Sequence, residues 1–90
     1  MLSVEEAKRI GINACIDKIG RDLCREYADN GVSGFGRRDN QVECFVGLND
    51  EHPAPVDPDN ITRLVLTHKR DWKYLVECSV DMQDCEIRFF

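Results

Sequence analysis

The chain has 90 residues, which is enough for one folded domain with its own core. Its 17 acidic and 12 basic side chains give a formal net charge of −5, which argues against a general nucleic-acid binder because phosphates would be repelled. The apolar runs are too short to span a membrane, and the first residues lack the basic start and apolar stretch of a signal peptide, so we expect a cytoplasmic protein.

The first predicted element is an amphipathic helix over residues 4–29. Ser3 and Glu6 have the spacing of a capping box, which satisfies backbone N–H groups at a helix start. Gly11 and Gly20 weaken a helix, and we attribute both to close approach of its backbone to a sheet. Apolar residues recur every three or four positions and form one stripe: Ile12, Cys15, Ile16, Ile19, Leu23 and Tyr27.

The glycine- and arginine-rich residues 31–40 follow this helix and are predicted to form a loop. Phosphate-binding glycine loops follow a strand and open a helix, whose first N–H groups meet the anion. Here the order is reversed, so a nucleotide site is not expected. A second loop, residues 49–60, contains all three prolines and shows no periodicity. Whether either loop binds a ligand stays open.

Apolar and polar residues alternate in four later segments, which predicts half-buried strands over residues 41–48, 61–68, 72–81 and 85–90. Short connections between the last three strands predict an antiparallel meander. A helix with one apolar stripe and a sheet with one apolar face bury each other. We therefore predict a single α+β domain over residues 1–90, a two-layer sandwich of one long N-terminal helix on a four-stranded antiparallel sheet, in the order α-β-β-β-β.

The alternation also predicts which side chains face the helix. In the first strand they are Val42, Cys44, Val46 and Leu48, and in the third they are Trp72, Tyr74, Val76, Cys78 and Val80. The basic cluster at residues 68–73 is then a charged hairpin turn, with Trp72 entering the core.

No catalytic, cofactor-binding or metal-binding residue is predicted. The five cysteines are odd in number and include no CxxC pair, so we expect buried thiols rather than disulfides. Neither an HxxxH pair nor a glycine-containing calcium loop occurs. The two histidines, His52 and His68, have no predicted position beside a cysteine or serine. A protein without enzymatic activity is therefore the favoured interpretation.

The functional hypothesis concerns the sheet face opposite the helix. It receives one large apolar residue from each predicted strand, namely Phe45, Val65, Leu75 and Phe90, within a rim of Glu43, Arg63, Lys73, Glu77 and Arg88. An apolar centre with a charged rim is typical of a protein–protein interface. We expect these four residues to bind a protein partner or a second copy of the chain.

Two alternatives remain open at this point. One is a small-ligand-binding protein or enzyme with a pocket between helix and sheet, lined by Tyr27, Cys44, Trp72, Tyr74 and Cys78. The other is an acidic inhibitor that imitates nucleic acid on a basic protein, which the negative net charge permits.

Overall fold

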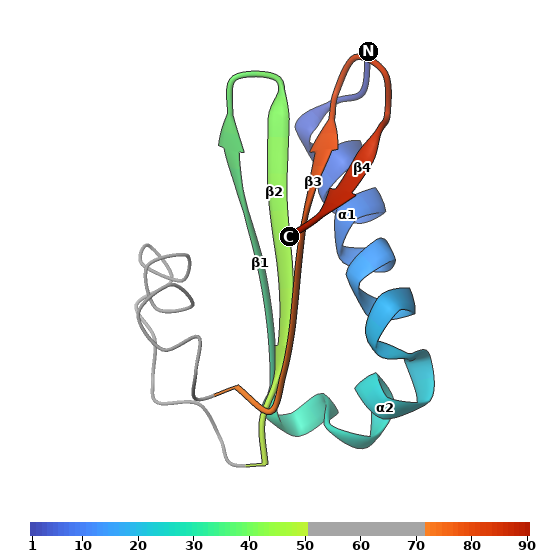
Figure 1. Ribbon diagram of the computed structural model, residues 1–90, viewed down its shortest axis with the longest axis vertical. Coiled ribbons are helices and arrows are strands. Elements are labelled where there is room, and N and C mark those ends of the chain that lie inside the picture. Colours follow the sequence, from blue (N-terminus) through green and yellow to red (C-terminus); the bar gives the residue numbers. More distant parts are fainter. Residues whose placement is uncertain (51–71) are drawn as a thin grey trace.

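The computed structural model describes residues 1–50 and 72–90. Its elements are α1 (Val4–Ile19), α2 (Arg21–Glu26), the 3₁₀ turn η1 (Ala28–Asn30), β1 (Gly31–Arg38), β2 (Gln41–Leu48), β3 (Tyr74–Asp81) and β4 (Ile87–Phe89). The strands of this described part form one antiparallel sheet in the order β1-β2-β3-β4, and α1 packs against β2 and β3 (Figure 1). The predicted α+β architecture, a long N-terminal helix on a four-stranded antiparallel sheet, is confirmed. Neither α1 nor α2 is long and apolar enough to cross a membrane.

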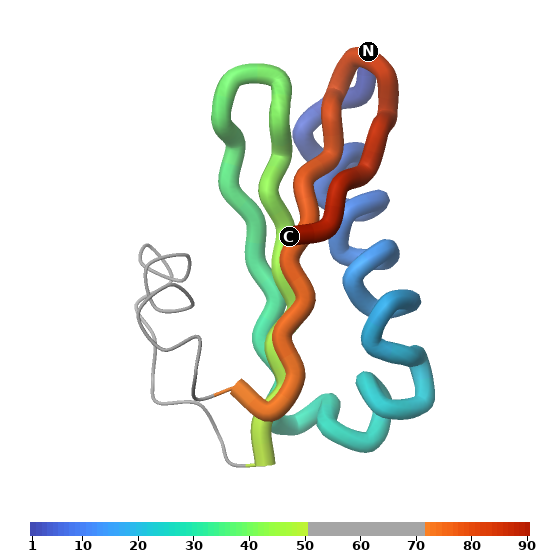
Figure 2. Tube along the Cα trace, in the orientation of Figure 1, coloured from blue at the N-terminus to red at the C-terminus, as the bar shows by residue number. Residues whose placement is uncertain are grey.

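The start of α1 follows directly from the local sequence. The backbone N–H of Glu6 donates to Ser3 Oγ and the backbone N–H of Ser3 donates to Glu6 Oε1, each at 3.1 Å, so the predicted capping box is present. The interaction lowers the pKa of the Glu6 carboxyl, because the ionised form is the better acceptor of the Ser3 N–H. The N-terminus lies beside the β3–β4 turn, where Leu2 N–H donates to the Met82 carbonyl at 2.7 Å (Figure 2).

Gly11 brings the backbone of α1 close to the sheet. A Cβ at this position would lie 2.4 Å from Cys44 Sγ and 3.1 Å from Val80 Cγ2. Ala7 and Cys15, one turn before and one turn after Gly11, are fully buried. The prediction that this glycine marks close helix–sheet contact is confirmed.

The prediction of one continuous helix over residues 4–29 is wrong at Gly20. This residue has φ 115° and ψ 126°, so the backbone leaves the helix and restarts as the short α2. A Cβ on Gly20 would touch nothing within 4 Å, so its role is conformational and not close packing. The apolar stripe did not reveal the break, because Leu23 and Tyr27 still pack against the core from the separate short elements.

The prediction of a loop over residues 31–40 is also wrong, because Gly31–Arg38 is β1. It pairs along its whole length with β2, from Gly31 opposite Leu48 to Arg38 opposite Gln41. Asp39 and Asn40 alone form the turn, with Asp39 at φ 55°, a conformation that aspartate tolerates better than most residues. Gly31, Gly34 and Gly36 interrupt the alternation of apolar and polar side chains by which the other strands were predicted.

The core lies between α1 and the sheet. The four residues of β2 that were predicted to face the helix are all buried. The core cluster comprises Ala7, Cys15, Val42, Cys44, Val46, Leu48, Cys78, Val80 and Met82. The predicted strand 61–68, Val65 within it and most of the proline-containing loop lie outside the described residues.

Two lysines of α1 cover the margins of the helix-side face. Lys8 Nζ lies 4.6 Å from the ring centroid of Phe35 on β1, and Lys18 Nζ lies 5.2 Å from that of Phe89 on β4. These cation–π contacts shield aromatic rings that the narrower helix does not cover. The helix side of the sheet is therefore covered at its centre and only in part at its margins, where Phe35 and Phe89 are 37% and 44% exposed.

Candidate functional site

The face of the sheet opposite α1 is called the outer face below. Because neighbouring residues of a strand point to opposite sides, the buried positions of β2 and β3 place Phe45 and Leu75 on the outer face. Phe90 follows β4, and its backbone N–H donates to the Glu77 carbonyl at 3.0 Å. These residues lie on the predicted side, but they are not equally accessible: Phe45 is 5% exposed, Leu75 is half-buried and Phe90 is 73% exposed.

Trp72 also lies on the outer face, which corrects the prediction that it enters the helix-side core. A Cβ on Gly47 would lie 2.7 Å from Trp72 Cε3, so the indole ring covers this glycine. Gly47 faces away from α1, since its neighbours Val46 and Leu48 are in the core. The alternation failed here because β3 begins at Tyr74 and residue 72 precedes it.

Lys73 belongs to a different site from the predicted rim. Its Nζ donates to the Tyr27 hydroxyl at 2.8 Å and lies 3.0 Å from Asp50 Oδ1. These two contacts, with Tyr27 the larger, raise the pKa of the Lys73 ammonium above its ordinary value. The group joins the segment after α2 to the ends of β2 and β3, so we interpret it as structural.

An apolar hollow of about 240 Å³ lies on the outer face. Gly36 of β1 lies opposite Glu43 of β2 and diagonally from Phe45, and a Cβ at Gly36 would meet nothing within 4 Å. The absence of a side chain at this position therefore leaves part of the hollow open. The lining residues are Phe35, Gly36, Glu43, Cys44, Phe45, Glu77 and Phe90.

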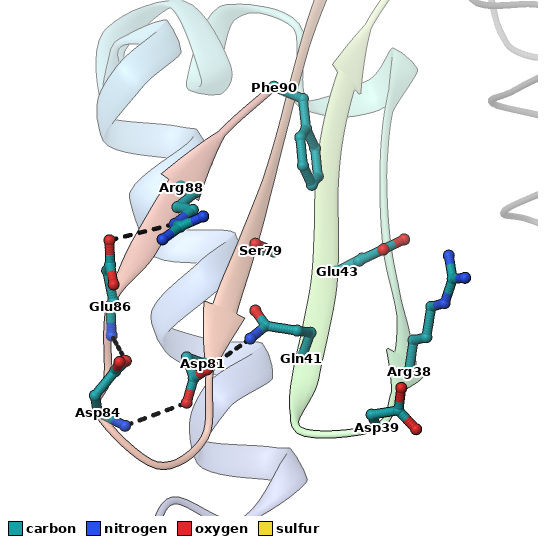
Figure 3. Close-up of a pocket in the computed structure, with 10 residues that line it drawn as sticks. All are labelled: Arg38, Asp39, Gln41, Glu43, Ser79, Asp81, Asp84, Glu86, Arg88 and Phe90. Atoms are coloured by element: carbon teal, nitrogen blue, oxygen red, sulfur yellow. Dashed lines mark hydrogen bonds and ion pairs between the residues drawn. The ribbon is translucent and has the colours of Figure 1, made fainter.

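A larger charged basin of about 470 Å³ adjoins the hollow and shares Glu43 and Phe90 with it. Figure 3 shows its side chains in front of the sheet, with the helices behind, so the basin also lies on the outer face. Its lining residues are Arg38, Asp39, Gln41, Glu43, Ser79, Asp81, Asp84, Glu86, Arg88 and Phe90. Five carboxylates face two guanidinium groups, which leaves an excess of three negative charges.

Hydrogen bonds fix the carboxylates at one end of this basin. Asp81 Oδ1 accepts from the backbone N–H groups of Gln83 and Asp84 at 2.8 and 3.2 Å. Asp81 Oδ2 accepts from Gln41 Nε2 at 2.6 Å, and Figure 3 draws the bonds from Asp84 and Gln41. The backbone donors contribute most to lowering the pKa of Asp81, so this side chain is ionised at neutral pH. Arg88 Nε pairs with Glu86 Oε1 at 3.3 Å. The basin is thus negative and partly preorganised.

Three buried thiols lie on the other side of the sheet, beneath α1. Cys15 Sγ is 3.5 Å from Cys78 Sγ, and the Cys78 thiol donates to the Gly11 carbonyl at 3.3 Å. Hydrogen bonding to Cys78 and burial raise the pKa of the Cys15 and Cys44 thiols, so both stay protonated at neutral pH. All three thiols are at most 2% exposed, and thiols without solvent access are poor nucleophiles, so we interpret the cluster as core packing.

The described residues suggest no catalytic centre. Within residues 1–50 and 72–90, no group of three histidine, cysteine, aspartate or glutamate side chains is arranged to hold a metal ion. His52 and His68 lie outside this part. Turn N–H groups and Arg88 hold several carboxylates of the basin in place, although negative charge remains in excess, and this suits binding of a cation better than proton transfer.

Sequence reasoning missed Gly36, Arg38 and Asp39 because it placed them in a loop. One signal could have found them, since Asp39 and Asn40 are a two-residue turn between segments that can pair. With this turn recognised, Gly36 and Arg38 fall on the same face as Phe45.

No protein-family model, curated protein or solved structure matches the chain. The functional argument therefore depends on the geometry of the outer face.

Proposed function

We propose that the protein is a non-enzymatic interaction module that binds a protein partner through the outer face of its sheet. The observation that carries this proposal is the apolar hollow beside Phe90, an aromatic side chain that is 73% exposed. Aromatic side chains at the edge of an apolar depression, surrounded by charged groups, are typical of the residues that dominate protein–protein binding.

The alternative of a ligand pocket between helix and sheet has less support. The close contact of Gly11 with Cys44 and Val80 leaves little space at the centre of that interface. Trp72, which was expected to line such a pocket, covers Gly47 on the outer face instead.

A photocrosslinking experiment tests the proposal, because β4 offers a matched pair of aromatic positions. Phe90 lies on the outer face, whereas the adjacent Phe89 lies on the helix side and is 44% exposed. A benzophenone amino acid is placed at position 90 or at position 89 and irradiated, first in purified protein and then in extract of the native host. The first condition tests binding of a second copy, and the second tests binding of a different protein.

We expect a discrete crosslinked species from position 90 that is absent from position 89. It should disappear when Gly36→Val is added, since this change fills the hollow. Equal yields from both positions, a yield that Gly36→Val does not reduce, or no crosslinked species in either condition would contradict the proposal.

A further inference from the structure

We infer that the outer face recognises a short polypeptide segment with one aromatic or large aliphatic side chain next to lysine or arginine. This inference rests on the proposed function and specifies the chemistry of its partner. Two properties of the outer face lead to it: the size of the hollow and the charge of the basin that adjoins it.

The apolar hollow has the size for one anchoring side chain. Its volume of about 240 Å³ is below the roughly 300–1,000 Å³ that is typical of small-molecule sites. Phe45 and Phe90 provide apolar walls, and the space above Gly36 is open. A single aromatic or branched aliphatic side chain would bury apolar surface there without displacing any backbone.

The adjoining basin selects the charge of the residues beside that anchor. Glu43 lines both the hollow and the basin, and it forms no hydrogen bond or ion pair within the part of the chain that the structure describes. An extended peptide advances about 3.3 Å per residue, so a side chain one to three positions from the anchor can reach Glu43 and Asp81. Lysine or arginine at such a position would offset the excess of three negative charges.

A second copy of the chain fits this face less well. Two outer faces would bring two basins of the same negative charge together, which disfavours association. This repulsion favours a short basic segment over a homodimer.

Fluorescence anisotropy with three labelled synthetic peptides of equal length tests this inference. The first contains one tryptophan between lysines, the second has glutamates in place of the lysines, and the third has alanine in place of the tryptophan. We expect the first to bind at least about tenfold more tightly than either of the others, with an affinity that falls as salt is added. Gly36→Val and Glu43→Gln should each weaken its binding at least about fivefold.

Matched control variants separate site-specific binding from general attraction. Ser33→Val introduces the same side chain on the other face of β1, and Glu26→Gln removes an exposed acid at the end of α2. Both controls should keep wild-type affinity, and all four variants should keep the wild-type unfolding midpoint. Equal binding of the lysine and glutamate peptides, or equal loss in Glu26→Gln and Glu43→Gln, would overturn the inference.

Failure of the inference is distinguishable from failure of the proposed function. If the basic peptide does not bind but sedimentation shows a dimer that Gly36→Val abolishes, the basic-segment inference is wrong and the outer face is still an interface. If the protein is monomeric, binds none of the peptides and gives no crosslink at position 90, both are wrong.

Discussion

The contact between Gly11 and the sheet gives the sharpest prediction about stability. In Gly11→Ala the new Cβ would lie 2.4 Å from Cys44 Sγ and 3.0 Å from Cys44 Cβ, whereas ordinary contacts are 3.4–4 Å. The sulfur or the helix must therefore retreat by about 1 Å in a closely packed interior. Cys44 is 2% exposed, so its side chain has little room to rotate away.

Two opposing effects set the magnitude. Replacing glycine by alanine inside a helix stabilises by up to about 1 kcal/mol, whereas overpacking a core costs about 1–3 kcal/mol. The 2.4 Å separation places this site near the upper end of that cost, so we expect a net loss of about 2 kcal/mol in the free energy of unfolding. For a domain of this size such a loss lowers Tm by roughly 10 °C.

Urea unfolding followed by circular dichroism measures this loss. Gly36→Ala is the control, because its Cβ would meet nothing within 4 Å, and it should change stability by less than about 0.5 kcal/mol. In a Cys44→Ala background, which lacks the sulfur, the cost of Gly11→Ala should fall below about 1 kcal/mol. A Gly11→Ala protein that is more stable than wild type would refute the close helix–sheet packing.

Four further predictions follow from local features. Ser3→Ala should lower the free energy of unfolding by about 1 kcal/mol through loss of the capping box, and an unchanged urea midpoint would speak against the cap. Gly20→Ala should cost about 1–3 kcal/mol because of φ 115°, although a Cβ there touches nothing; a stabilised variant would mean that α1 and α2 can join. Because folding lowers the pKa of Asp81, its carboxylate stabilises the fold at pH values above the unfolded pKa of about 3.9. This stabilisation is lost as the pH falls through the lower pKa of the folded state. In Asp81→Asn the free energy of unfolding should therefore fall less steeply between neutral and acidic pH than in the wild type. The same pH dependence in both proteins would contradict this. Exposed Cys85 should react with a thiol reagent at once, whereas buried Cys15 should react only as fast as the protein opens, so equal rates would exclude the buried cluster.

The elements that the sequence predicts correctly depend on local or strictly periodic information. The capping box involves only Ser3 and Glu6, and the alternation around Cys44 indicates which side chains of β2 face α1. The helix-on-sheet architecture follows from the apolar stripe of the helix and the apolar face of the sheet alone.

The incorrect predictions arose where tertiary structure, and not periodicity, determines the conformation. The break at Gly20 is invisible in an apolar stripe that continues through α2. β1 is a strand because it pairs with β2, although Gly34 and Gly36 contribute no side chains to the outer face. For the same reason the hollow above Gly36 could not be predicted, since its shape depends on a missing side chain opposite Glu43.

Chemical-shift mapping of backbone amides during titration with the lysine-flanked tryptophan peptide tests the central claim most directly. The account predicts that the largest changes occur at Gly36, Glu43, Phe45, Glu77 and Phe90, which line the apolar hollow, while the exposed side of α1 stays unchanged. Changes concentrated on α1, or no changes at saturating peptide, would contradict recognition through the outer face.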